Sequence, residues 1–139
     1  MSRILGIDYG ERRIGLAISD PLGIIALSLP TLDTKKVKDV FEEIKTIVKE
    51  KGVEKIVLGL PRNMDGTIGE KGEKVKEFAN KLKGKIGKEI DFWDERLTSV
   101  ESLKILREEK RKIKREKKIV DQISAVLILQ GYLDNLARK

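Results

Sequence analysis

An aspartate follows the first apolar run of the chain, residues 4–7, and stands at a position where chemistry is common. A second apolar run, residues 14–18, comes after the turn signal Tyr9-Gly10, so the pattern predicts a β-hairpin with Asp8 at its rim. Residues on such connections often bind ligands or catalyse reactions. The simpler interpretation is that Asp8 only opens the turn, because aspartate side chains hydrogen-bond to nearby backbone in turns.

The inventory of reactive side chains favours the catalytic interpretation. The chain has 139 residues and contains no histidine and no cysteine. Ser-His-Asp and Cys-His sites are therefore excluded, and so are the nitrogen and sulfur ligands that zinc prefers. Clustered carboxylates instead suit hard cations such as Mg²⁺ or Mn²⁺, which keep several waters and bridge to phosphate oxygens. If the protein is an enzyme, the sequence favours metal-assisted phosphate chemistry.

The first half of the chain contains the elements that would position Asp8. Three apolar runs predict an antiparallel meander of strands: residues 4–7, 14–18 and 23–29, the last closed by Pro30. From Thr34 onward, apolar residues recur every three or four positions, which predicts an amphipathic helix that Gly52 ends. The compact apolar run 55–60 predicts a fourth strand, parallel to the first.

The second half of the chain contributes two further sets of carboxylates. Residues 62–69 form a polar loop with two glycines, a candidate phosphate site because backbone amides at the start of a helix bind anions. After a helix with one apolar face, a fifth strand, residues 89–93, ends in Asp94-Glu95. A further helix and a largely buried last helix, residues 119–136, complete the chain. Asp121 lies in the first turn of that last helix.

This order of elements is typical of the ribonuclease H-like fold. It predicts one α/β domain, residues 1–139, with a five-stranded mixed sheet of three antiparallel and two parallel strands flanked by helices. In that fold the final helix crosses the sheet, so its acid approaches the acids at the strand ends. Three distant carboxylates would then converge and hold two metal ions about 3.5 to 4 Å apart.

The charge of the chain indicates an anionic partner. The formal net charge is +7 and the isoelectric point is near 9.5, and no long apolar segment appears, so nucleic acid is favoured over a membrane. Much of the excess charge lies in residues 107–118, the basic segment, whose net charge is +5. The basic segment either binds phosphates as an electrostatic arm or forms a solvated helical face. Its candidate phosphate-binding residues are Lys110, Arg111, Lys112, Lys114 and Arg115.

Four sequence blocks support a more specific resemblance. They are Gly6-Ile7-Asp8-Tyr9-Gly10 with Arg13-Ile14-Gly15-Leu16-Ala17 and Ser19-Asp20, Gly59-Leu60-Pro61 with Asn63-Met64-Asp65-Gly66, Asp94-Glu95-Arg96-Leu97-Thr98, and Asp121 with Ala125-Val126-Leu127-Ile128-Leu129-Gln130. In this register they resemble the YqgF family, also called RuvX, along nearly the whole chain. The resemblance implies a ribonuclease H-like nuclease that matures the 5′ end of precursor 16S ribosomal RNA, a family earlier described as Holliday-junction resolvases.

The resemblance also implies which acids are catalytic. Asp8, Glu95 and Asp121 correspond to the metal-binding acids of the family. Many ribonuclease H-like nucleases carry an acid at the end of the fourth strand, whereas this chain has Leu60-Pro61-Arg62 there. Glu95 on the fifth strand must therefore substitute. The alternative for Asp121 is that it serves as a favourable charge at the helix N-terminus.

Several side chains near these acids are candidates for binding the substrate. Arg96 either orients Glu95, holds a scissile phosphate or forms a structural ion pair, since guanidinium groups bind oxyanions bidentately. Arg12 and Arg13 in the hairpin, with Arg62 and Asn63 in the loop, are expected to flank the cleft and contact backbone phosphates.

The sequence therefore predicts a nuclease that uses Mg²⁺ or Mn²⁺ on structured precursor ribosomal RNA. The alternatives are a nuclease for branched DNA, with the same acids acting on a four-way junction, and a catalytically silent nucleic-acid-binding module. We also expect association with the ribosome, a monomer or homodimer, no membrane contact, and a cytoplasmic location because no signal peptide is visible.

Overall fold

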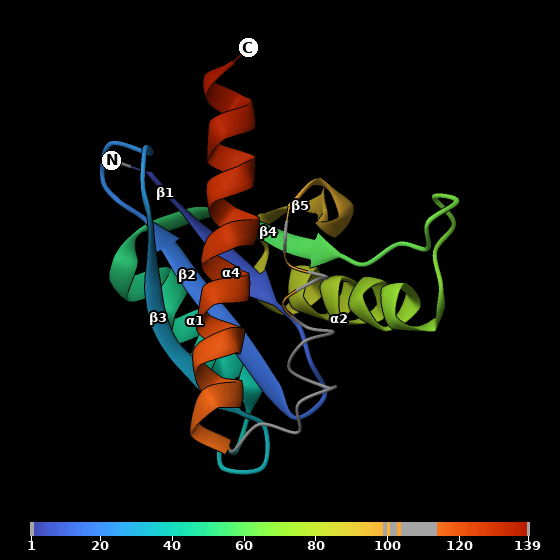
Figure 1. Cartoon of the computed structure of the whole chain (residues 1–139). Helices are drawn as coiled ribbons and strands as arrows, with labels where there is room; N and C mark the ends of the chain where they lie inside the picture. Colours follow the sequence, from blue (N-terminus) through green and yellow to red (C-terminus); the bar gives the residue numbers. More distant parts are fainter. Residues whose placement is uncertain (1, 99, 101–102, 104–113, 139) are drawn as a thin grey trace.

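The computed structural model describes residues 2–98, 100, 103 and 114–138, and at its centre is a five-stranded mixed sheet (Figure 1). The strands are β1 (Arg3–Asp8), β2 (Arg13–Ser19), β3 (Ala26–Asp33), β4 (Val53–Leu60) and β5 (Glu89–Asp94). Their order across the sheet is β3-β2-β1-β4-β5. The β1–β2 and β2–β3 pairs are antiparallel, and the β1–β4 and β4–β5 pairs are parallel. This arrangement confirms the predicted sheet.

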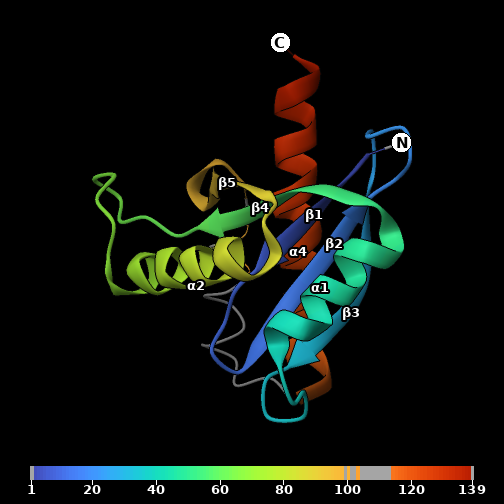
Figure 2. The ribbon, with the colours of Figure 1, turned by 180° about the vertical axis from the view of Figure 1, so that it is seen from behind.

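The helices cover both faces of the sheet. On one face lie α1 (Val40–Lys51) and α2 (Glu70–Ile86), and the other face is crossed by α4 (Lys114–Ala137), as the opposed views of Figures 1 and 2 show. A short 3₁₀ helix, η1 (Glu95–Leu97), follows β5. In the part of the chain that the structure describes, no helix is both long enough and apolar enough to cross a bilayer.

The alternation of side chains along β1 decides which layer Asp8 faces. Leu5 and Ile7 are buried in the core formed with α1 and α2. Gly6 lies between them and faces α4, because a Cβ built on it would lie 2.7 Å from the Cβ of Leu129. Successive side chains of a strand point to opposite faces, so Asp8 also faces α4.

Close contact between α4 and the sheet depends on glycines in three adjacent strands. Gly6 is the first, in β1. A Cβ on Gly15 of β2 would lie 2.3 Å from the carbonyl oxygen of Asp121, and one on Gly59 of β4 would lie 2.4 Å from Cδ1 of Ile128. Real Cβ atoms do not approach other atoms so closely. Because these positions lack side chains, α4 packs directly on the backbone of the sheet and brings Asp121 to the end of β1.

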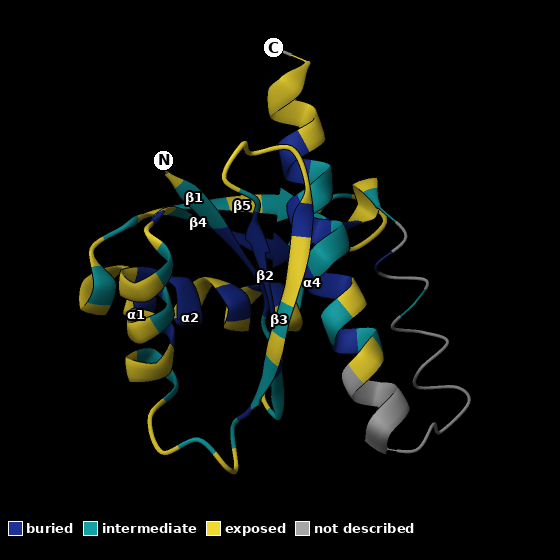
Figure 3. Cartoon of the chain, turned by 90° about the vertical axis from the view of Figure 1, so that its left-hand side faces the viewer, coloured by how far each residue is buried: buried dark blue, intermediate teal, exposed yellow. Residues whose placement is uncertain are grey.

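The third strand differs from the prediction. It begins at Ala26 and continues through Pro30 to Asp33, whereas the sequence predicted a strand from 23 to 29 that Pro30 ends. Residues 24 and 25 belong to a turn, where the Asp20 carboxylate accepts hydrogen bonds from their backbone amides. Proline is tolerated inside β3 because β3 is an edge strand and its register against β2 shifts at that point. Figure 3 shows much of β3 exposed, with buried strands behind it.

The first helix also begins later than predicted, at Val40 instead of near Thr34. Asp39 is its N-cap and accepts hydrogen bonds from the amides of Phe41 and Glu42. The predicted end is correct, because Gly52 adopts a left-handed conformation and donates to the carbonyl of Val48. The apolar spacing alone did not reveal that residues 34–37 form a turn.

Candidate active site

The first component of the candidate site is Asp8, the last residue of β1. Its side chain is 5% exposed and faces α4. In the sheet, Asp8 pairs with Gly15 of β2. The carboxylate therefore lies at the rim of the hairpin, as the sequence predicted, but it is buried beneath α4 and does not project into solvent.

Asp121 of α4 packs on the strand beside Asp8. Its backbone carbonyl packs on Gly15, the residue that pairs with Asp8. The Asp121 side chain is buried, and its Oδ2 accepts a 2.7 Å hydrogen bond from Nε of Arg13. Arg13 is itself only 16% exposed, so this is an ion pair largely removed from solvent. The sequence placed Arg13 among the phosphate-binding residues, and the structure uses its guanidinium to hold Asp121.

Glu95, which follows β5, lies at the same end of the sheet as Asp8. It is the first residue of η1, directly after Asp94, and is 1% exposed. One of its carboxylate oxygens, Oε2, would lie 2.9 Å from a Cβ built on Gly59 of β4. The residue before Gly59 pairs with Ile7, so Gly59 lies beside the end of β1. The three predicted acids thus gather at one end of the sheet, on the face covered by α4.

The three carboxylates are not arranged as a complete metal-binding site. In the part of the chain described here, no group of three or more acidic side chains is arranged so that it could hold a single ion. The ion pair with Arg13 gives Asp121 a partner that a bound cation would have to share or displace.

A cleft opens beside Glu95, with a volume of about 570 Å³. Its walls come from the hairpin turn after β1, the loop after β4 and the first turns of α2. The residues that line it are Tyr9, Gly10, Glu11, Pro61, Arg62, Asn63, Gly69, Glu70, Lys71, Gly72, Lys74, Val75 and Glu95. The loop predicted as a phosphate site therefore borders the same cleft as a predicted catalytic acid.

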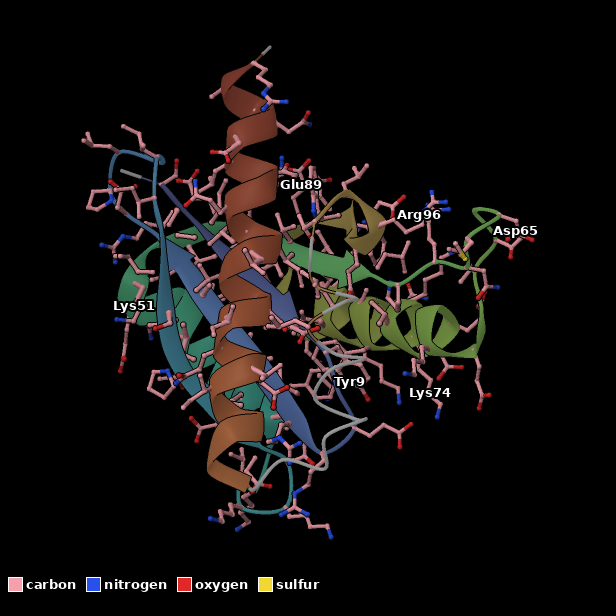
Figure 4. The ribbon with its side chains drawn as sticks, viewed as in Figure 1. Tyr9, Lys51, Asp65, Lys74, Glu89 and Arg96 are labelled. Atoms are coloured by element: carbon pink, nitrogen blue, oxygen red, sulfur yellow. The ribbon has the colours of Figure 1, made fainter. Side chains whose placement is uncertain are left out.

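Lys74 and Tyr9 are cleft residues that the sequence did not single out, and they lie near each other in Figure 4. Lys74 of α2 forms an ion pair with Glu11 of the hairpin turn, and this partner raises the pKa of the lysine, which stays charged. Burial raises the pKa of the Tyr9 hydroxyl. The position of Tyr9 directly after Asp8 is the one sequence signal that could have identified it.

The loop between β4 and α2 is held by its own side chains. Arg62 donates from Nη1 to the carbonyl of Gly66 at 3.0 Å. Asn63 donates from Nδ2 to the hydroxyl of Thr67, and the Asp65 carboxylate accepts from the amide and hydroxyl of the same threonine. These bonds from Thr67 lower the pKa of Asp65. The loop is a preformed wall of the cleft.

Arg96 forms the structural ion pair that was one of its three predicted roles. Its Nε lies 3.1 Å from both carboxylate oxygens of Asp94, and its Nη2 lies 2.7 Å from Oδ2. The hydrogen bond from Arg96 is the main cause that lowers the pKa of Asp94. Arg96 also donates to the carbonyl of Met64, so it joins η1 to the loop that carries Asp65 (Figure 4).

The structure gives less information on the remaining residues that were predicted to bind substrate. Arg12 is paired with Asp33 at 3.0 Å, on a partly exposed surface. The residues Lys110, Arg111 and Lys112 lie outside the described residues, and the backbone of Lys114 and Arg115 begins α4. Phosphate contact by any of these side chains stays a prediction.

Comparison with solved structures identifies the class of fold as ribonuclease H-like, the architecture of RuvC. RuvC of Thermus thermophilus in complex with a Holliday junction substrate matches with a TM-score of 0.58 at 11% identity, covering 99% of this chain and 97% of that chain. The fowlpox virus Holliday junction resolvase matches with a TM-score of 0.52 at 11% identity, covering 96% of this chain and 99% of that chain. At such low identity the likeness shows the fold alone, and it confirms the predicted fold.

Sequence comparison identifies the family. The sequence profile of RuvX, described as "Holliday junction resolvase", matches residues 2–135. A Clostridium novyi protein named "Putative pre-16S rRNA nuclease" is 49% identical over 134 residues, which is 96% of this chain and 99% of the relative. A Clostridium tetani protein of the same name is 50% identical over 137 residues, 99% of each chain. The chain belongs to the RuvX family, which confirms the resemblance found in its sequence.

Proposed function

We propose that this protein is a divalent-metal-dependent nuclease that processes the 5′ end of precursor 16S ribosomal RNA. Membership of the RuvX family and the names of the clostridial relatives support the proposal. The observation that carries it is the convergence of three buried carboxylates, Asp8, Glu95 and Asp121, beside a cleft. Burial raises the free energy of a charged carboxylate, and a bound cation would offset that penalty.

The residues present fit Mg²⁺ or Mn²⁺. All three candidate ligands are carboxylates, and hard cations of this kind prefer oxygen donors. When bound, such ions supply an activated water and stabilise the leaving oxygen of a phosphodiester. Asp8 ends β1, which lies between β2, on which Asp121 packs, and β4, which Glu95 approaches, so Asp8 would be the central one of the three ligands.

The other residues of the chain position the acids and the substrate. Arg13 fixes the orientation of the Asp121 carboxylate through its 2.7 Å hydrogen bond. The ion pair between Arg96 and Asp94 holds the backbone on both sides of Glu95. The cations that line the cleft, Arg62, Lys71 and Lys74, are the groups that would bind the phosphates of the substrate.

The Asp8→Asn variant tests this function. It keeps the shape of the side chain but removes its charge, so we expect Mg²⁺- or Mn²⁺-dependent cleavage of a precursor 16S transcript to fall by at least about a thousandfold. RNA binding and the unfolding temperature should stay close to those of the unmodified protein. The matched control is Asp39→Asn, which keeps an effective N-cap on α1, a helix on the sheet face opposite α4, and should cleave normally. Cleavage retained by Asp8→Asn would remove the proposed site.

Cleavage of four-way DNA junctions is the second candidate function, because the family is described as a Holliday junction resolvase. The same acids would serve either substrate, so the two candidates differ only in what the cleft accepts. Cleavage of precursor 16S RNA and of a four-way junction by the same preparation, compared in parallel, decides between them. Tight binding of both without turnover would instead favour a catalytically silent binding module. Ribosome association, location in the cytoplasm and oligomeric state stay predictions.

A further inference from the structure

Ser124 of α4 is fully buried, and its hydroxyl has no hydrogen-bond partner among the described residues. Serine inside a helix commonly donates to the carbonyl one turn earlier, which satisfies the hydroxyl without any ligand. Ser124 does not do so. A buried polar group without a partner destabilises a fold, so its presence calls for a reason.

The position of Ser124 relative to the three acids gives such a reason. Ser124 lies one helical turn after Asp121, a spacing that places two side chains next to each other on a helix surface. It lies one turn before Ile128, whose Cδ1 packs on Gly59 where Oε2 of Glu95 also approaches. The helical spacing therefore places Ser124 between Asp121 and the part of α4 that packs on Gly59 beside Glu95.

The direction of α4 places Ser124 toward the end of β1 that carries Asp8. Asp121 packs on Gly15, opposite Asp8, whereas Leu129 packs on Gly6, so α4 runs antiparallel to β1. Moving one turn back from Ile128 toward the start of α4 therefore moves toward Asp8. On the side of α4 that faces β4, where Ile128 packs on Gly59, Ser124 is the residue one turn nearer to Asp8.

The other buried polar atoms without a partner in the described part of the chain belong to strands of the sheet, not to α4. One is the hydroxyl of Thr31 in the edge strand β3, and the other is the indole nitrogen of Trp93 in β5, against α4 near Gly131. Of the three, Ser124 is the one whose helix neighbour is a predicted catalytic acid.

We propose that Ser124 is a positioning residue of the active site, whose hydroxyl would hydrogen-bond to a ligand of the divalent cation that the neighbouring acids bind under the proposed function. This inference rests on the proposed function, because it requires a cation at Asp8, Glu95 and Asp121. Groups that hydrogen-bond to the ligands of a metal typically change its affinity by about 10- to 100-fold. A bound cation would thus give the buried hydroxyl of Ser124 the hydrogen-bond partner that it lacks among the described residues.

The Ser124→Ala variant gives two effects of opposite sign, which a purely structural role would not produce. Without divalent ions, we expect the unfolding temperature to stay the same or rise, because a buried hydroxyl without a partner has been removed. In a Mn²⁺ titration without nucleic acid, followed by calorimetry, we expect the Kd to rise about tenfold. The temperature increase that Mn²⁺ gives should shrink accordingly.

The matched control is Thr31→Val, which removes another buried hydroxyl without a partner, on the edge strand β3 two strands from β1, and keeps the side-chain shape. Its Mn²⁺ affinity should equal that of the unmodified protein. An unchanged Kd in Ser124→Ala, or a lower unfolding temperature without metal, would overturn the role of Ser124 and leave the proposed function intact. Absence of Mn²⁺ binding by the unmodified protein would instead overturn the proposed function itself, and the two failures are thereby distinguished.

Discussion

The ion pair between Arg13 and Asp121 is the residue contact that most directly shapes the candidate site. Replacing Arg13 with Gln leaves a buried carboxylate without its cation, so we expect the free energy of unfolding in metal-free buffer to fall by about 3 kcal/mol. Added Mn²⁺ should restore part of this loss, because the ion takes over the charge of Arg13. Urea denaturation with and without Mn²⁺ measures both effects.

Arg12→Gln is the matched control for this prediction. Arg12 pairs with Asp33, but its side chain is 38% exposed, and exposed pairs contribute about 1 kcal/mol or less. Its loss should therefore be small and independent of Mn²⁺. Equal destabilisation by the two variants would show that the Arg13 pair behaves as an ordinary surface contact and has no special relation to the site.

At the residue scale, the sequence identified the candidate acids but not the contacts that their neighbours make. Asp8, Glu95 and Asp121 were chosen from the sequence, and the structure brings them to one end of the sheet. That Arg13 turns inward could not be predicted, because its partner is 108 positions away and only the packing of α4 on β2 brings them together. The unpartnered hydroxyl of Ser124 was likewise invisible before the tertiary contacts were known.

At the scale of elements, the distance between α4 and the sheet is set by glycine. A Cβ on Gly59 would meet Cδ1 of Ile128 at 2.4 Å and Oε2 of Glu95 at 2.9 Å. We therefore expect Gly59→Ala to lower the free energy of unfolding by about 1 to 3 kcal/mol. We also expect it to reduce cleavage by more than that loss explains, because Glu95 must move. Denaturation curves and cleavage rates under conditions where the variant is fully folded test both parts.

Gly84→Ala provides the control for the same substitution in open space. A Cβ on Gly84 of α2 would meet nothing within 4 Å, and alanine is the better helix former by about 1 kcal/mol. This variant should be slightly more stable and fully active. If Gly59→Ala behaves in the same way, the close packing of α4 on β4 is not what positions Glu95.

The elements that the sequence placed well are those with a clear period of hydrophobicity. The strands β1, β2 and β4 and the helix α1 satisfy this condition, and their existence, type and pairing were predicted correctly. The start of α1 was wrong because the turn before it keeps an apolar residue at helical spacing. The end of β3 was wrong because Pro30 breaks most strands, and only the position of β3 at the edge of the sheet removes that restriction.

At the scale of the whole molecule, the predicted architecture followed from the order of elements and the rule that parallel strands need a crossover helix. The cleft could not be predicted in the same way, because it is lined by segments separated in the sequence: the hairpin turn, the loop with the first turns of α2, and Glu95. The net charge of +7 is a whole-chain property of another kind, since it concerns the partner and not the fold.

The contribution of the basic segment to RNA binding can be measured from the salt dependence of the affinity. Replacing Lys110, Arg111 and Lys112 with Gln removes three of its charges. If these side chains contact phosphates, the slope of log affinity for RNA against log salt concentration should become shallower by about 2, because fewer counterions are released. The cleavage rate at saturating RNA should change little, since none of the three acids is affected.

The matched control neutralises three exposed lysines that do not line the cleft, Lys35, Lys36 and Lys38. Equal slopes for the two variants would mean that the basic segment is a solvated surface and that the cleft itself supplies the phosphate contacts.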